Sequence, residues 1–337
     1  MPTTPDSLSA NSRATRKPGV LLYSLGFVLI QAGLLTLTVV LVSSPWFLTH
    51  DDYPGMLQSG YGMRLQHEDC EVLIYGDSTT LTGLDPAVVQ QMTGLKTCNI
   101  AEGGTIQGVV GSRFPLDAYL SRNKRPRFLL TMYSPLLFRP DRKLLDDYKP
   151  EGMIYAFQND RTPAFYRGLL HRREWAFDFV AFAAQRMIGY FLQHYLLGVQ
   201  RNTVDTRAQR DGRRGIWPYN FPPETHCLRG PIGPNDVARY ADEVASMRAH
   251  YAVQGTQVIV NIAPVPICSV SYEIYRSMSE GLHDNAFERL PISYFNEGDV
   301  HFSPEGSRYI SIEAGNQILA LEKRQDAQRQ AAHGVAP

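Results

Sequence analysis

Apolar residues form one long run near the N-terminus and several short runs further along the chain. The long run, Val20–Val42, contains no charged residue, and a helix of this length covers a hydrocarbon core of about 30 Å. Basic residues precede it and acidic residues follow it, which predicts a cytoplasmic N-terminus and an exported bulk. A cleaved signal peptide is the alternative, but its apolar core usually has only about 7–15 residues. We therefore expect a disordered cytoplasmic tail over 1–19 and an uncleaved single-pass anchor over 20–43 in the inner membrane.

The short apolar runs predict strands that alternate with helices. Strands are expected over 71–75, 94–100, 127–132 and 257–262, and helices after Asp85, over 114–120, over 236–253 and from Ser303 to Leu321. This alternation is typical of the α/β class, with a parallel sheet covered by helices on both faces. The predicted organisation is a linker over 44–69, one domain over 70–324 and a disordered tail over 325–337.

The connection between the third and fourth predicted strands, residues 136–234, is longer than a minimal domain needs. Its part 163–199 is helical by pattern and rich in aromatic residues. An insertion that leaves the carboxyl edge of the sheet is well placed to form a lid, a docking surface or a membrane-surface contact. The alternative is that its aromatic rings simply pack on the core.

Composition excludes some classes of function. The chain has 33 Lys and Arg against 33 Asp and Glu, so it lacks the basic excess of a nucleic-acid-binding protein. The four cysteines would face an oxidising compartment in the exported part, where they either pair or remain buried free thiols. Their spacing fits no zinc pattern, and we predict neither a metal nor an organic cofactor. The cysteines are Cys70, Cys98, Cys227 and Cys268.

Two blocks contain residues suited to nucleophilic catalysis. Ser78 follows the strand-like run Val72–Tyr75, which places its hydroxyl at the carboxyl edge of a parallel sheet, where such sheets bind ligands. A serine hydroxyl needs an imidazole to take its proton and a carboxylate to orient that imidazole. His301 is the candidate base and Asp299 the candidate carboxylate, with Glu297 as the fallback. The alternative for Ser78 is a simple helix cap.

These two blocks, Gly76-Asp77-Ser78-Thr79 and Asp299-Val300-His301, resemble those of the SGNH/GDSL hydrolase superfamily. The resemblance implies a flavodoxin-like three-layer sandwich around a central parallel sheet. It also implies a Ser78–His301–Asp299 triad. The single residue between Asp299 and His301 departs from the superfamily's usual two.

The resemblance also implies donors for an oxyanion. The Ser78 amide is one, and Gly103 or Gly104 after the second strand matches the superfamily's glycine block. Ser134 stands where the third block usually has an asparagine, so that donor is missing and Ser134 is a possible substitute. We expect Asp77 to support the turn by hydrogen bonds.

The Asp-x-His spacing resembles that of SGNH-like proteins of polysaccharide O-acetylation, which partner membrane-bound O-acyltransferases. The expected function is therefore a membrane-anchored serine O-acyltransferase that moves an acyl group, usually acetyl, to a polysaccharide outside the cytoplasm. A carbohydrate acetylesterase is the first alternative, since the same triad hydrolyses esters. A catalytically decayed subunit of an exopolysaccharide acylation complex is the second, and the missing asparagine favours it.

Overall fold

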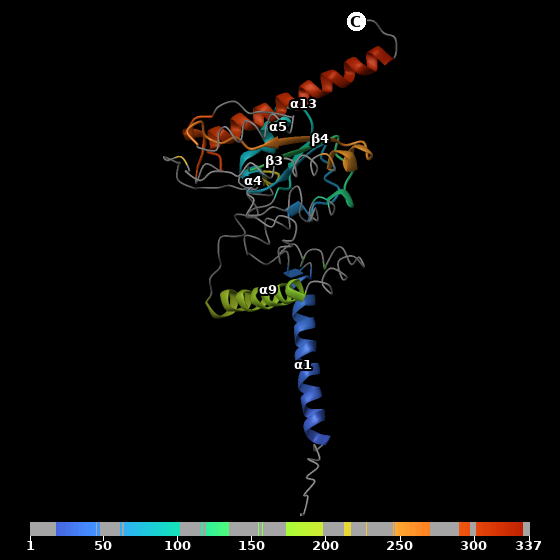
Figure 1. Cartoon of the computed structure of the whole chain (residues 1–337), viewed down its shortest axis with the longest axis vertical. Helices are drawn as coiled ribbons and strands as arrows, with labels where there is room; N and C mark the ends of the chain where they lie inside the picture. Colours follow the sequence, from blue (N-terminus) through green and yellow to red (C-terminus); the bar gives the residue numbers. More distant parts are fainter. Residues whose placement is uncertain are drawn as a thin grey trace, which may run out of the picture.

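The computed structural model shows an α/β domain and a long N-terminal helix, α1 (Pro18–Val42) (Figure 1). The domain lies beyond one end of α1, and helix α9 (Arg173–Phe191) lies between them (Figure 1). The structure describes residues 18–44, 46–47, 61–62, 64–101, 116, 119–134, 154, 157, 173–197, 212–216, 227, 245, 247–269, 290–296 and 301–332.

Four parallel strands form the sheet in the order β2-β1-β3-β4. They are β1 (Val72–Gly76), β2 (Thr97–Asn99), β3 (Phe128–Tyr133) and β4 (Gln257–Ile262). In the register, Val72 of β1 lies opposite Thr97 and Phe128, and Phe128 lies opposite Gln257. The parallel sheet that the alternating pattern predicts is thus confirmed.

Strand β2 is shorter than the sequence predicts. Helix α5 (Pro86–Thr93) ends on Gly94, whose φ of 74° is a left-handed conformation that favours glycine. The residues that follow form the turn into the sheet, so pairing begins only at Thr97. Gly94 therefore closes a helix and does not begin a strand.

Both faces of the sheet are apolar because both are covered. Val72 and Ile74 point to the face covered by α5 and α13 (Pro304–Ala332). Leu73 and Tyr75 point to the other face, where helical residues such as Tyr251 complete the cluster. The predicted helices over 114–120 and 236–253 are helical at their described residues, except that Val253 is already in the turn before β4, and the rest of each lies outside the described part.

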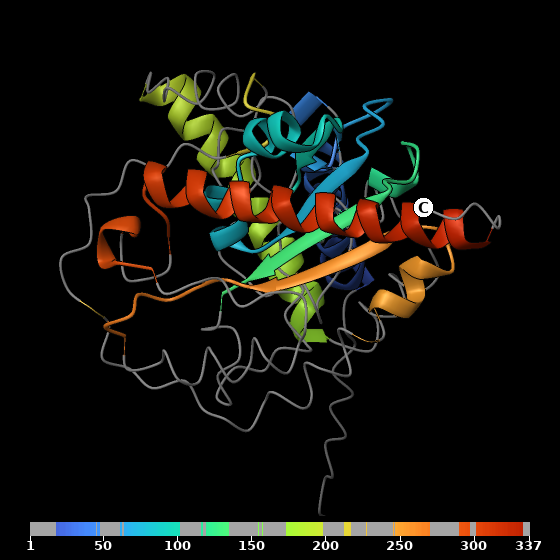
Figure 2. The same ribbon diagram turned by 90° about the horizontal axis from the view of Figure 1, so that it is seen from above.

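Helix α13 runs antiparallel to β4 and covers one face of the sheet (Figure 2). The side-chain amides of Asn261 and Gln317 exchange two hydrogen bonds of 2.9 and 3.1 Å, and Gln325 donates to Gln257 at 2.6 Å. The predicted disordered tail from residue 325 is therefore wrong over 325–332. This segment is rich in strong helix formers, and the amide contact at Gln325 holds it against the sheet.

All four cysteines are paired. The inner disulfide joins Cys70 to Cys98 across β1 and β2, and both residues are buried. The outer disulfide joins Cys227 to Cys268, and Cys268 is exposed. Of the two alternatives that the sequence left open, pairing is therefore the one that the structure shows.

Helix α1 is apolar and long enough to cross a membrane: residues 19–42 have a mean hydropathy of 2.4 over their most apolar window. Most of its large apolar side chains are exposed along the helix. Only its last turns are covered, with Val39 and Val42 buried at the end nearest α9. The predicted apolar helix over 20–43 is confirmed with slightly different bounds: it begins at Pro18, so the predicted disordered tail is wrong over 18–19.

Candidate active site

The candidate nucleophile lies at a tight turn between β1 and helix α4 (Ser78–Gly83). The turn starts at Gly76, where a Cβ atom would lie within 3.0 Å of the Met132 carbonyl oxygen on β3. Only glycine lets the two strands approach so closely at this point. Thr80 reinforces the approach, because its buried hydroxyl donates to the same carbonyl. Ser78 is the first residue of α4 and is half-buried, whereas the other residues of this helix are buried.

Asp77 joins this turn to the neighbouring strand. Its Oδ1 accepts hydrogen bonds from the amides of Thr79 (2.9 Å) and Thr80 (3.4 Å), which caps α4. Its Oδ2 accepts from the amide of Ser134, directly after β3, at 2.8 Å. One buried carboxylate thus ties the end of β1 to the end of β3. The supporting role predicted for Asp77 is confirmed and extends to a second strand.

The hydrogen bond between Asp77 and Ser134 lies at the boundary between β1 and β3. From β1 the chain moves to β2 on one side and later to β3 on the other, so the β1–β3 boundary is the topological switch point. Open parallel sheets bind ligands in the crevice outside the carboxyl ends of the strands at such a point. Ser134 directly follows the carboxyl end of β3. Ser78 follows the carboxyl end of β1 after one residue, the capping Asp77.

The environment of Asp77 opposes its ionisation. The side chain is buried, and this burial raises the pKa of Asp77 above its ordinary value of 3.8. The amides of Ser134, Thr79 and Thr80 favour the carboxylate and oppose that rise. A buried carboxyl held between three N–H groups has its orientation fixed, which suits a support for the nucleophile turn.

The segment that contains His301 packs on the same short helix. A Cβ atom at Gly83, the last residue of α4, would overlap the ring of Phe302. Ser307 donates a hydrogen bond of 2.8 Å to the Gly83 carbonyl. Helix α4 rises about 1.5 Å per residue, so Ser78 lies only about 8 Å along the axis from Gly83. Because α13 is antiparallel to β4, its start, and His301 before it, lie at the carboxyl edge where Ser78 lies.

A tight reversal holds His301 in place. Phe295 and Phe302 form an antiparallel bridge, and the Asn296 amide donates to the His301 carbonyl at 2.7 Å. His301 as a whole is half-buried, but both nitrogens of its imidazole are buried. Asp299 and the fallback Glu297 lie in 297–300, outside the described residues, so the orienting carboxylate stays a prediction. The structure thus places the neighbours of His301, Phe302 and Ser307, against the end of α4, and the pairing of His301 with Ser78 stays a prediction.

The oxyanion donors are only partly described. Gly103 and Gly104 lie in 102–110, outside the described residues. Ser134 is buried, and its amide donates to Asp77.

Sequence reasoning missed one scaffolding residue at this edge. Asn99 ends β2, is fully buried, and donates from its side-chain amide to the carbonyls of Thr80 (3.0 Å) and Leu84 (2.9 Å). Its own amide oxygen accepts from the Ala101 amide at 2.9 Å. Asn99 therefore fixes α4 to β2, as Asp77 fixes it to β3. A polar residue at the end of an apolar strand was the signal that could have identified it.

No family model, curated protein or solved structure matches this chain. The resemblance to the SGNH/GDSL superfamily therefore rests on the two short blocks around Ser78 and His301. The strand order adds one compatible feature, since flavodoxin-like sheets begin with the order 2-1-3-4. Among the residues that the structure describes, no three metal-ligating side chains gather at one place.

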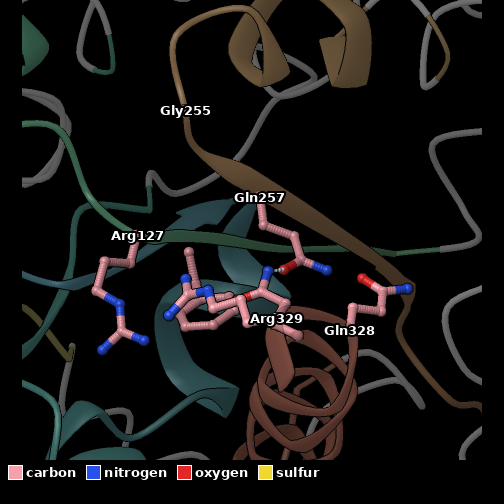
Figure 3. A pocket seen from close by; sticks show the side chains of 7 residues that line it. Arg127, Gly255, Gln257, Gln328 and Arg329 are labelled. Carbon is pink, nitrogen blue, oxygen red and sulfur yellow. Dashed lines mark hydrogen bonds between the residues drawn. The ribbon is translucent and has the colours of Figure 1, made fainter. Parts of the chain in front are cut away.

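A cavity of about 440 Å³ lies at the opposite edge of the sheet, where β3 and β4 begin (Figure 3). Arg127, Gln257 and Arg329 line it, and each arginine pairs with a carboxylate of α13. A six-residue strand is about 20 Å long, so this cavity is well separated from Ser78. The cavity is therefore separate from the candidate active site.

Proposed function

We propose that the protein is a membrane-anchored serine O-acyltransferase of the SGNH type, which moves an acyl group to a polysaccharide outside the cytoplasm. The observation that carries the proposal is the Asp77 carboxylate, which fixes the Ser78 turn to the end of β3 at the switch point of the sheet. Asp77, and not Ser78, caps α4, so the alternative role of Ser78 as a helix cap is wrong. The neighbouring His301 segment supplies the candidate base.

The proposed reaction has two balanced steps. Ser78 Oγ attacks the carbonyl carbon of an acyl donor while His301 takes the hydroxyl proton, and the leaving group departs with that proton. A sugar hydroxyl then attacks the acyl-serine carbonyl carbon while His301 takes its proton; the bond between Ser78 Oγ and the acyl carbon breaks, and His301 passes the proton to Oγ, which releases the sugar ester and restores Ser78. Asp299 orients the imidazole, and the Ser78 amide with the glycines at 103 and 104 stabilises the oxyanion.

Membrane attachment and export support the acyltransferase over a free esterase. Helix α1 has the length and composition of a membrane span. Two disulfides are typical of an oxidising compartment, which favours an extracytoplasmic domain. An anchored nucleophile has a high effective concentration near a donor delivered by a membrane-bound O-acyltransferase. The acceptor class, a polysaccharide, comes from the resemblance of the Asp-x-His block.

A non-catalytic subunit of an acylation complex is the second candidate. The observation that favours it is Ser134, whose amide is occupied by Asp77 and whose side chain replaces an asparagine donor. Loss of one oxyanion donor costs about 10²–10³ in turnover. Labelling of the serine separates a slow enzyme from a subunit that has no catalytic activity.

The deciding experiment is active-site labelling of the full-length protein with a fluorophosphonate probe. We expect the adduct on Ser78 by mass spectrometry, and its loss in Ser78→Ala. Ser121→Ala, which changes an exposed serine in the turn before β3, is the matched control and should label like the native protein. Absence of labelling under conditions that label a known serine esterase contradicts the enzyme and favours the subunit.

A second measurement separates transfer from hydrolysis. With an activated acetyl ester as donor and a polysaccharide present, the transferase places acetyl on the polymer. An acetylesterase releases acetate at the same rate with and without polymer. Equal acetate release in both conditions, with no acetyl on the polymer, contradicts the transferase and leaves the esterase.

A further inference from the structure

Helix α9 and the π-helical turn after it, η2 (Leu192–Leu196), expose a row of large apolar side chains. Phe177 is 73% exposed and Leu196 is 74% exposed, and such exposure is informative where several large apolar side chains form one patch. We call this row the α9 stripe. It consists of Phe177, Ile188, Phe191, Leu192, Tyr195 and Leu196.

The stripe occupies one side of the helix. At 3.6 residues per turn, Phe177, Ile188 and Phe191 fall within an arc of about 60°. Arg186 and Tyr190 lie on the opposite side, and both are buried. The helix therefore packs on the protein through one side and presents the stripe on the other.

The buried side of α9 is attached to the end of α1. The Tyr190 ring lies 5.9 Å from Trp46 and 5.1 Å from Phe47, measured between ring centroids, and these two residues come shortly after the end of α1 at Val42. Val39 and Val42 of α1 are buried at the same end. Figure 1 shows α9 lying across the end of α1, with the α/β domain on the other side. The exposed apolar surface of α1 thus continues into α9.

The charge pattern matches a lipid environment. From 176 to 197 the charged residues are Asp178 and Arg186, and Arg186 is on the buried side. The α9 stripe is as exposed as the residues of α1 itself, such as Tyr23 at 77%. Exposed apolar patches of this kind mark binding to proteins or membranes. The adjoining candidate span favours the membrane.

We propose that α9 and η2 lie in the outer interface of the bilayer, with the α9 stripe in contact with lipid acyl chains. The inference rests on the proposed spanning role of α1, because the bilayer surface is then level with the end of α1 where α9 lies. Helices with one strongly apolar side bind in this way, parallel to the membrane plane. The α/β domain is thereby held close to the outer surface of the membrane by both α1 and α9.

The test measures the depth of single fluorophores on the full-length protein in phosphatidylcholine–phosphatidylglycerol nanodiscs. Leu196→Cys is labelled with an NBD maleimide, which spares the native cysteines because they are paired. Val253→Cys is the matched control: it replaces a 90% exposed apolar residue in the α/β domain, next to the start of β4. We expect lipid-borne doxyl groups to quench the label at 196 at least about twofold more than the label at 253. Aqueous iodide should show the opposite preference.

Two outcomes overturn the proposal. If iodide quenches the label at 196 as strongly as at 253, the stripe faces water. If the label at 196 is exposed to iodide in nanodiscs but protected from both quenchers in native membranes, a protein covers the stripe. Alkaline carbonate extraction of native membranes tests α1 separately: retention of the protein together with an iodide-accessible label would overturn the role of α9 alone. Neither readout depends on acyl transfer.

Discussion

Asp77 gives the sharpest test of how the candidate site is built. In Asp77→Ala, the amides of Thr79, Thr80 and Ser134 lose their acceptor in a buried place. A cap is worth about 1 kcal/mol, and an unsatisfied buried donor costs about 1–3 kcal/mol, while removal of a buried carboxyl returns part of this. We expect the free energy of unfolding to fall by about 3–5 kcal/mol, a large fraction of the stability of a typical domain.

The chain offers a matched control in Asp85. This residue also caps a helix, α5, but accepts only one amide hydrogen bond, from Ala87 at 2.8 Å, and is tied to no second strand by its side chain. Asp85→Ala should lose only about 1 kcal/mol. The assay is urea unfolding of the full-length protein in nanodiscs, followed by near-ultraviolet circular dichroism. If the free energy of unfolding falls equally in the two variants, the contact of Asp77 with Ser134 does not stabilise the domain.

Asp77→Asn tests the charge separately from the shape. The asparagine carbonyl can serve either the α4 amides or Ser134, and its NH₂ group then faces the remaining amide donor, which costs about 1–3 kcal/mol. The folded-state pKa of Asp77 is raised, so the folded protein holds this proton more tightly than the unfolded chain. The stabilisation from protonation is complete below pH 3.8 and is lost as the pH rises through the folded-state pKa. The stability advantage of the native protein over Asp77→Asn should therefore shrink as pH rises, and an advantage that grows contradicts the raised pKa.

Three further predictions use the same protein. The outer disulfide should react with mild reductant before the inner one, as measured by thiol alkylation and mass spectrometry, and removal of either should cost about 3–4 kcal/mol in the free energy of unfolding. Gly76→Ala should destabilise the domain by about 2–3 kcal/mol through overlap with the Met132 carbonyl, whereas Gly94→Ala, with open space around it, should lose about 1–2 kcal/mol. His301→Gln should slow fluorophosphonate labelling by about 10²–10⁴-fold with unchanged unfolding, whereas the exposed His250→Gln should label normally; equal labelling rates would refute His301 as the base.

The sequence predicted the elements better than the contacts between them. Apolar runs located all four strands because burial on both faces of a parallel sheet leaves an uninterrupted apolar signal. The turn at Ser78 was predictable for the same reason, since a strand with a polar residue directly after it ends there. The end of α13 was misjudged because its last turns are polar throughout and are held by contacts to distant residues such as Gln257.

The tie between Asp77 and Ser134 could not be predicted, because the two residues are 57 positions apart and their contact depends on the register of β1 with β3. The pairing of the cysteines depends on the sheet in the same way. Cys98 comes opposite Leu73 only once β1 and β2 pair, and this brings it near Cys70. Local patterns determine where strands end, and strand order then determines which ends meet.

The orientation of the sheet relative to α1 connects the two proposals. Helix α13 crosses the direction of α1 in Figure 1 and is seen at full length from above in Figure 2. Since α13 is antiparallel to β4, the carboxyl edge of the sheet faces sideways, along the surface of the membrane that α1 is proposed to span. A donor held by a neighbouring protein in the same membrane would then approach Ser78 from the side. A helix in the interface, as proposed for α9, would keep that edge at a constant height above the bilayer, which is the condition under which anchoring raises the effective concentration of the nucleophile.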